Sequence, residues 1–178
     1  MIPAKFDYVR PGSLAEAVSA LAGGGDDAKV IAGGQSLLPL LRLRLSYPEL
    51  LVDVAGLDEL RGVTDVGDAL LIGARTTHYQ LVHDPLIAEH CGLLAQAAGT
   101  VADPAVRHRG TLGGALAHCD AAGDLPAVAL ALDAVLIAQG PGGEREIAAA
   151  DFFVDYLTSS LEPDEILTGI RVPKLGAG

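Results

Sequence analysis

Short apolar runs alternate with amphipathic segments over the first 55 residues of the chain. Three runs rich in aliphatic and aromatic side chains are predicted strands: residues 6–9, 29–32 and 50–54. A helix is predicted after Ser13, because Ser13-x-x-Glu16 has the form of a capping box and apolar residues follow at helical spacing. A second helix is predicted after Ser36, which is expected to cap it. The helix is expected to carry Leu37, Leu40, Leu41 and Leu45, and the stripe of Leu37, Leu40 and Leu41 is expected to face the core. This alternation predicts a small parallel βαβ lobe.

The pattern changes after residue 55, where pairs of strands replace the alternation. Apolar runs flank the turn residues 67–68 and 140–143, which predicts two antiparallel hairpins. A final strand is predicted over residues 165–172. Helices are expected from Thr77, over residues 86–98 and from Asp124, whereas the Gly-rich segment 110–118 is expected to be irregular. We therefore predict an α+β protein with two lobes, residues 1–55 and residues 56–178.

Composition and charge narrow the classes of function. The chain has 12 basic and 23 acidic residues, a net charge of −11, which disfavours nucleic acid as a partner. Two cysteines cannot supply the four thiolates of an iron–sulfur cluster. The N-terminus has no apolar signal region, and no stretch is long and apolar enough for a transmembrane segment. A cytoplasmic location is expected.

The first candidate ligand site is the loop Ala32-Gly33-Gly34-Gln35-Ser36, between a predicted strand and a predicted helix. Glycine permits positive φ and lets a ligand lie against the backbone, and the start of the next helix offers unpaired N–H groups to an anion. The loop therefore suits a pyrophosphate. A tight strand-to-helix turn with no ligand is the alternative.

The second candidate ligand site is the segment Thr111-Leu112-Gly113-Gly114-Ala115, which follows Gly110 and two arginines. Two Gly-rich loops on two lobes suit a dinucleotide held from both sides. Neither loop has the Walker A pattern or the Gly-x-Gly-x-x-Gly pattern, so ATP hydrolysis and a Rossmann NAD site are disfavoured. Arg107 and Arg109 are candidates to contact a phosphate or a partner protein, with a solvated edge as the alternative.

Other chemistry has little support in the sequence. Gly34-Gln35-Ser36 lacks the final glycine of a nucleophile elbow, and the His–Cys pairs are adjacent dipeptides whose side chains diverge. Asp120 and Asp124 are interpreted as a cap and a hydroxyl acceptor rather than as an acid–base pair. We therefore predict neither a catalytic dyad nor a metal site.

Three motifs together give the chain a resemblance to a known family. These are the loop 32–39, the run Val101-Ala102-Asp103-Pro104-x-Val106-Arg107-x-Arg109-Gly110-Thr111-Leu112-Gly113-Gly114, and Asp124-Leu125-Pro126-Ala127. In these motifs the chain resembles the FAD-binding (medium) subunit of molybdenum hydroxylases, of the carbon monoxide dehydrogenase type. The resemblance covers essentially the whole chain.

The resemblance implies an FAD-binding fold of the PCMH (vanillyl-alcohol-oxidase-like) type, with FAD between the two lobes. Residues 32–36 and 111–115 would hold the pyrophosphate through amides and hydroxyls. Val101 and Leu161 would lie against the flavin ring, and Asp124 would accept hydrogen bonds from the ribityl or ribose region. The implied partners are a molybdopterin-binding large subunit and a small 2Fe–2S iron–sulfur subunit, with FAD passing their electrons to a final acceptor.

The chain departs from the family pattern in two respects. Ala115 stands where family members often have a polar residue, which removes a side-chain contact and keeps a backbone donor. Family members also continue for about another hundred residues into a C-terminal lobe that supplies a lysine near the flavin, so weaker retention of FAD is expected here. The sequence thus predicts an electron-transfer flavoprotein subunit. The alternative is a binding or assembly module that keeps the fold without efficient flavin retention.

Overall fold

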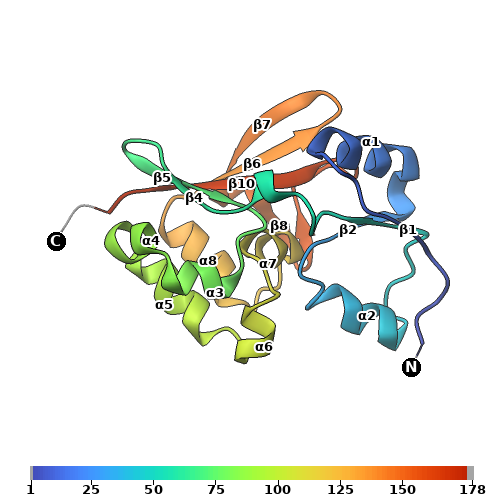
Figure 1. Cartoon of the computed structure of the whole chain (residues 1–178), viewed down its shortest axis with the longest axis horizontal. Helices are drawn as coiled ribbons and strands as arrows, with labels where there is room; N and C mark the ends of the chain where they lie inside the picture. Colours follow the sequence, from blue (N-terminus) through green and yellow to red (C-terminus); the bar gives the residue numbers. More distant parts are fainter. Residues whose placement is uncertain (1, 176–178) are drawn as a thin grey trace.

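Two β-sheets of different kinds organise the chain in the computed structural model, which describes residues 2–175 (Figure 1). The first sheet is parallel, has the strand order β1-β3-β2 and consists of β1 (Asp7–Val9), β3 (Leu50–Asp53) and β2 (Ala28–Ile31). Both connections pass through helices, α1 (Leu14–Gly24) and α2 (Leu37–Leu43). The predicted parallel βαβ lobe is therefore present.

The second sheet is antiparallel and has the strand order β4-β5-β10-β6-β7. Its strands are β4 (Val63–Asp65), β5 (Ala69–Gly73), β10 (Ile166–Pro173), β6 (Val135–Gly140) and β7 (Gly143–Ala148). The last strand in the sequence lies at the centre, between the two predicted hairpins. A separate short hairpin pairs β8 (Phe153–Asp155) with β9 (Thr158–Ser159).

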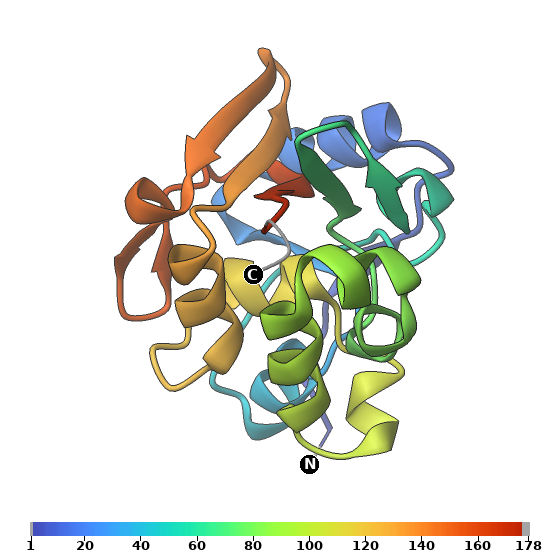
Figure 2. The same ribbon diagram turned by 90° about the vertical axis from the view of Figure 1, so that its left-hand side faces the viewer.

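Short helices lie on one side of the antiparallel sheet, as the two views in Figures 1 and 2 show. They are α3 (His78–His83), α4 (Pro85–His90), α5 (Gly92–Thr100), α6 (Pro104–Arg107), α7 (Leu112–His118) and α8 (Asp124–Ala131). The remaining helical turns are η1 (Gly25–Asp27), η2 (Asp58–Leu60) and α9 (Ala149–Phe152). The larger hydrophobic core fills the space between these helices and the sheet, with Leu70, Leu116 and Phe152 fully buried.

A smaller core lies beneath α1 and joins the two sheets. Ala17, Val18 and Leu21 of α1 pack in one cluster with Val52 of β3 and with Ile166 at the start of β10. Because Ile166 belongs to the antiparallel sheet, burial of this cluster couples the lobes. The lobe boundary at residue 55 stays a prediction.

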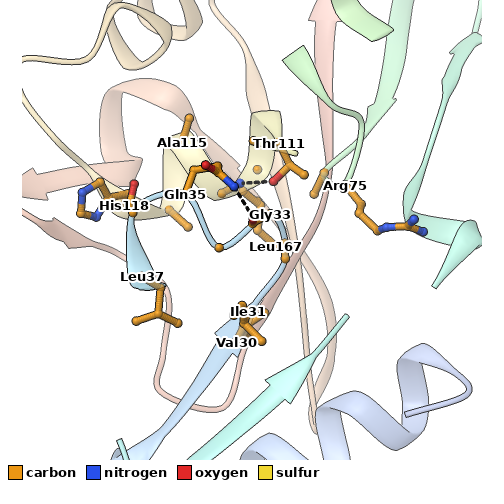
Figure 3. Close-up of a pocket in the computed structure, with 18 of the residues that line it drawn as sticks. Val30, Ile31, Gly33, Gln35, Leu37, Arg75, Thr111, Ala115, His118 and Leu167 are labelled. Carbon is orange, nitrogen blue, oxygen red and sulfur yellow. Dashed lines mark hydrogen bonds between the residues drawn. The ribbon is translucent and has the colours of Figure 1, made fainter. Parts of the chain in front are cut away.

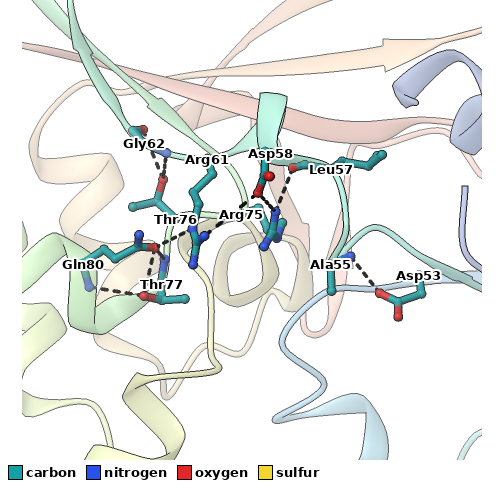
Figure 4. A network of polar contacts seen from close by, with 10 residues as sticks. All are labelled: Asp53, Ala55, Leu57, Asp58, Arg61, Gly62, Arg75, Thr76, Thr77 and Gln80. Atoms are coloured by element: carbon teal, nitrogen blue, oxygen red, sulfur yellow. Dashed lines mark hydrogen bonds and ion pairs between the residues drawn. The ribbon is translucent and has the colours of Figure 1, made fainter. Parts of the chain in front are cut away.

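Polar contacts tie the segment between the sheets to the second lobe (Figure 4). Arg75 Nη1 donates to the Leu57 carbonyl at 2.9 Å and to Asp58 Oδ1 at 3.1 Å. The Thr76 hydroxyl, in a side chain only 1% exposed, accepts from the Gly62 amide and donates to the Gly62 carbonyl. Buried polar groups satisfied in this way fix one path for the segment.

Several element predictions are wrong. Residues 86–98 form two helices rather than one, broken at Cys91, and the short elements α6, α9, β8 and β9 were not predicted. The Ser36 hydroxyl makes no capping hydrogen bond, because Ser36 already has helical φ and ψ. The second helix is shorter than expected: α2 ends at Leu43, so Leu45 lies beyond it and is 68% exposed, whereas Leu41 is buried and Leu37 and Leu40 are half-buried.

The segment 112–118 corrects another expectation, since it is the helix α7 and not an irregular loop. Thr111 caps this helix by accepting a hydrogen bond from the Gly114 amide. Gly113 is needed by packing, because a Cβ there would lie 2.5 Å from the Cβ of Ala74. Helix propensity alone therefore misjudged this segment, where close contact with Ala74, the residue after β5, requires glycine.

Candidate functional site

A cavity of about 530 Å³ lies where the two Gly-rich segments meet (Figure 3). Its wall contains all but one of the residues predicted to bind a cofactor: Ala32, Gly33, Gly34, Gln35, Ser36, Val101, Thr111, Gly113, Gly114, Ala115, Asp124 and Leu161. The exception is Leu112, whose side chain is 2% exposed and belongs to the larger core. The fold thus brings residues from both lobes around one space.

The two Gly-rich segments touch through their backbones. A Cβ on Gly33 would lie 2.1 Å from the Arg109 carbonyl oxygen and 2.9 Å from the Gly110 Cα. Real Cβ atoms do not approach backbone this closely, so any side chain here would force the lobes apart. Gly110 is constrained in turn, since its own Cβ would lie 2.8 Å from the His78 ring.

The first loop has backbone donors available for a ligand. Within residues 2–175, the amides of residues 33–37 make no hydrogen bond to protein atoms. Gly34 has φ of 71°, a conformation that glycine adopts without strain. The Gln35 side chain bends back to donate from Nε2 to the Gly33 carbonyl at 3.1 Å, as Figure 3 shows. A run of unengaged amides on a glycine turn suits an anionic group.

The second loop differs from this expectation, because its amides are already engaged. The N–H groups of Leu112 and Gly113 donate to the carbonyls of Thr76 and Ala74, and that of Ala115 donates to the Thr111 carbonyl. The Gly114 amide donates to the Thr111 hydroxyl at 3.1 Å. That hydroxyl accepts this bond and keeps its own proton to donate to a ligand. The expected contribution of amides 112–115 is therefore corrected to one hydroxyl and a close backbone surface.

Asp124, at a different part of the cavity wall, is linked to the residue that precedes Val101. Thr100, the last residue of α5, donates from its hydroxyl to Asp124 Oδ2 at 3.3 Å. Asp124 thus accepts a hydrogen bond from a protein hydroxyl, its role toward a cofactor stays a prediction, and Asp120 accepts from the Ala122 amide as a turn cap. Val101 follows Thr100 directly, so this bond fixes the start of the 101–103 loop relative to α8.

Charged groups at the cavity are mostly paired with protein partners. Arg75 is held by Leu57 and Asp58, and its guanidinium points away from the Gly-rich segments (Figure 3). Glu165 forms a bidentate salt bridge with Arg145, whose Nε and Nη2 donate to Oε1 and Oε2 at 2.6 and 2.7 Å. The Arg145 hydrogen bonds hold the pKa of Glu165 below its usual value. Lys29 also lines the cavity and makes no ion pair among the described residues, so it is the one cavity cation left for an anion beside the neutral backbone and hydroxyl donors.

His78 is a cavity residue that the sequence analysis did not select. It is 4% exposed, and its Nδ1 is buried without a hydrogen-bond partner among the described residues. Burial, with a smaller effect of the Arg107 charge, lowers the pKa of His78 to about 4. The imidazole is therefore neutral at pH 7. No spacing rule marked it, because its role depends on packing against Gly110.

Arg107 was predicted only as a candidate phosphate or partner contact, and the structure gives it an internal role. Its Nη1 donates to the carbonyls of Val101 and Ala102, both at 2.9 Å. Arg107 does not line the cavity, whereas Val101 does. The neighbouring Arg109 has an exposed side chain.

The described residues hold neither a cluster of metal-ligating side chains nor a helix able to cross a bilayer. Within residues 2–175, no three His, Cys, Asp or Glu side chains gather closely enough to hold a metal ion. None of the helices in that range has the length and apolarity needed to span a bilayer.

The two sheets form two lobes, and the cavity where their Gly-rich segments meet has the backbone donors and the close backbone surface that suit a dinucleotide. The chain belongs to the family described as the FAD binding domain in molybdopterin dehydrogenase, whose model matches residues 4–175. The resemblance seen in the sequence, the α+β FAD-binding fold and the cofactor of the family, FAD, are thereby confirmed.

Individual relatives support this membership over the whole chain. The carbon monoxide dehydrogenase medium chain of Hydrogenophaga pseudoflava is 43% identical over 178 residues, which is 100% of this chain and 62% of that protein. The 6-hydroxypseudooxynicotine dehydrogenase complex subunit alpha of Paenarthrobacter nicotinovorans is 46% identical, again over 100% of this chain and over 60% of that protein.

A solved structure shows the same similarity in three dimensions. A chain of carbon monoxide dehydrogenase from Hydrogenophaga pseudoflava, in a form lacking the Mo-pyranopterin moiety, matches with a TM-score of 0.98 and 44% identity. The match covers 100% of this chain and 62% of that one. The chain therefore spans about three fifths of the length of these relatives.

Proposed function

We propose that this chain holds FAD in the cavity between its two Gly-rich segments and serves as the electron-transfer part of a molybdenum hydroxylase-type dehydrogenase. The observation that carries the proposal is the backbone contact between Gly33 and Gly110, beside the unengaged amides of residues 33–37. A pyrophosphate needs several hydrogen-bond donors and close approach to the backbone, and this part of the cavity offers both. FAD, when bound, supplies the redox chemistry.

The chain's own residues bind and orient the cofactor in this proposal. The amides of the first loop and the Thr111 hydroxyl donate to the pyrophosphate. Val101 and Leu161 form apolar wall for the flavin ring, and Asp124 accepts hydrogen bonds from the ribityl or ribose region. Ala115 offers a small apolar surface where a polar side chain would add a contact. No residue is assigned an acid–base role.

The whole assembly is proposed from the relatives. Their names describe a medium chain and a complex subunit, which supports partner subunits for this chain also. We propose a molybdopterin-binding large subunit and a small 2Fe–2S subunit that delivers electrons to FAD. A cytoplasmic location stays a prediction.

Cofactor identity tests the proposal directly. The purified chain is titrated with FAD and, separately, with FMN, while flavin absorption and fluorescence are recorded. We expect saturable binding of FAD and much weaker binding of FMN, because FMN lacks the pyrophosphate bridge and the adenosine. Preference for FMN, or no binding of either flavin, would contradict the proposal. The second result would favour the binding or assembly module.

A further inference from the structure

The loop that carries Val101 is a closed structural unit between α5 and α6. Asp103 Oδ1 accepts from the Val106 amide at 2.9 Å, which caps α6, and the Arg107 amide donates to the Asp103 carbonyl at 3.0 Å. From the last residue of α6, the Arg107 side chain reaches back to the Val101 and Ala102 carbonyls. One arginine therefore ties together both ends of a segment of seven residues.

Ala102 gives this loop a strained backbone. Its φ is 42°, in the left-handed region that residues with a Cβ rarely adopt. Such a conformation persists only when surrounding contacts hold it. The two charge-assisted hydrogen bonds from Arg107 go to the two peptides that flank Ala102, and they are the contacts that hold this conformation.

The strained turn decides where the cavity wall lies. Val101 lines the cavity and is half-buried, whereas Arg107 contributes nothing to the lining. If the turn at Ala102 relaxed, the Val101 carbonyl would rotate, because it shares a peptide plane with the Ala102 nitrogen, and the backbone that carries the Val101 side chain would have to adjust. Arg107 thus acts on the cavity through the loop and not by touching a ligand.

We propose that Arg107 is a positioning residue that holds the strained 101–102 turn and so sets the wall against which the flavin ring packs. The inference rests on the proposed FAD function for the ligand that fills the cavity. Its structural half, the support of a left-handed alanine by Arg107, does not depend on any ligand. A direct phosphate contact by Arg107 is the competing account, and the experiment separates the two.

The test compares FAD with ADP, which shares the pyrophosphate and adenosine but lacks the flavin ring. We expect Arg107→Met to weaken FAD binding about ten-fold, the usual effect of losing hydrogen bonds from a charged donor, and to change ADP binding less than two-fold. Arg107→Lys, which keeps the charge and a donor, should fall between. Arg42→Met is the matched control, because it removes the same charge from an exposed side chain that does not line the cavity, and it should match the wild type.

A second variant tests the strain. Glycine adopts positive φ freely, so Ala102→Gly combined with Arg107→Met should recover most of the lost FAD affinity and restore the flavin absorption spectrum. Urea unfolding is then measured without ligand for the wild type, Arg107→Met, Ala102→Gly and the double variant. Arg107→Met should cost less stability in the Ala102→Gly background than in the wild type, which would show that the two positions are energetically coupled.

The outcomes are distinct. Equal losses of FAD and ADP affinity would assign Arg107 to the phosphates, and unchanged binding of both would leave it no role at the cavity; either result overturns the proposal. Additive stabilities in the urea series would overturn the strain argument even with no flavin present. A wild-type chain that binds no FAD but shows the stability coupling would instead contradict the proposed function while supporting the turn.

Discussion

Gly33 and Gly110 form a backbone-to-backbone contact between the two lobes, because a Cβ on Gly33 would lie 2.9 Å from the Gly110 Cα. Gly33 follows β2 of the parallel sheet. Gly110 precedes Thr111, which forms a β-bridge with Thr77, shortly after β5 of the antiparallel sheet. The contact therefore sets the distance between the lobes at the point where the cofactor is proposed to bind. A side chain here would therefore disturb the contact between the lobes and, with it, the proposed binding of the cofactor.

Gly33→Ala is expected to lose both stability and ligand binding. The added methyl group would meet the Arg109 carbonyl oxygen at 2.1 Å, and backbone must shift to accommodate it. Overpacking of this kind costs about 1–3 kcal/mol, measurable as a lower free energy of unfolding in urea. Gly99→Ala is the matched control. Gly99 lies within α5, where alanine is favoured over glycine, and its added methyl group would meet Val82 of α3 at an ordinary 3.8 Å. This variant should be neutral or stabilising. Equal stability of the two variants would show that the lobes are not in fixed contact.

Gly34→Val should reduce FAD binding more than it reduces stability. Gly34 has φ of 71°, and a β-branched side chain there is strained by about 1–3 kcal/mol. A well-packed domain tolerates a loss of that size, but relaxing the turn would redirect the unengaged amides of residues 33–37. FAD titration beside a urea unfolding curve separates the two effects. Wild-type FAD affinity in this variant would make the loop a structural turn.

Gly114→Val should also weaken FAD binding, although for a different reason from the one the sequence indicated. Gly114 lies inside α7 and has no positive φ; a Cβ there would lie 2.8 Å from the Thr111 hydroxyl oxygen. The substitution would therefore displace the cap of α7 and the one hydroxyl proposed to reach the pyrophosphate. Thr111→Val, which removes only the hydroxyl, should reproduce most of the loss and cost about 1 kcal/mol in stability. If Thr111→Val binds FAD normally, the hydroxyl has no part in the site.

Local patterns in the sequence predicted most of the fold. Ser13 and Thr77 cap their helices as expected, and the hairpin turns at residues 67–68 and 140–143 lie where glycine marked them. These signals succeed because caps and turns depend on side chains within a few residues. Both Gly-rich segments line the same cavity, as the resemblance of the chain to one family implied.

The errors arose where tertiary contacts override local preference. Glycines suggested an irregular segment at 110–118, but residues 112–118 form α7, and position 113 is glycine because Ala74 leaves no room for a side chain. The engagement of amides 112–115 follows from pairing with residues 74–76, which no local pattern reveals. Arg107 and His78 were likewise missed as structural parts of the site, since their roles depend on a strained turn and on burial.

The neutral His78 should make the free energy of unfolding depend on pH. Burial and the Arg107 charge lower the pKa of His78 to about 4 in the folded chain, against an ordinary value of 6.5. Between these two pH values His78 is protonated in the unfolded chain and neutral in the folded chain. The free energy of unfolding therefore falls as the pH falls from about 6.5 towards 4. The difference of the two pKa values corresponds to about 3 kcal/mol when the window has been crossed, and to about 2 kcal/mol between pH 7 and pH 5.

Urea unfolding at pH 7 and pH 5 tests this dependence on His78. The wild type should lose the His78 contribution in addition to any change shared with its variants, whereas His78→Gln, which does not titrate, should show a shallower pH dependence by about 2 kcal/mol. His83→Gln is the matched control, because the His83 ring is exposed on the same helix, and it should keep the wild-type dependence. If all three proteins lose the same stability between the two pH values, His78 is protonated in the folded chain. Its buried Nδ1 would then need a partner that the packing around Gly110 does not provide.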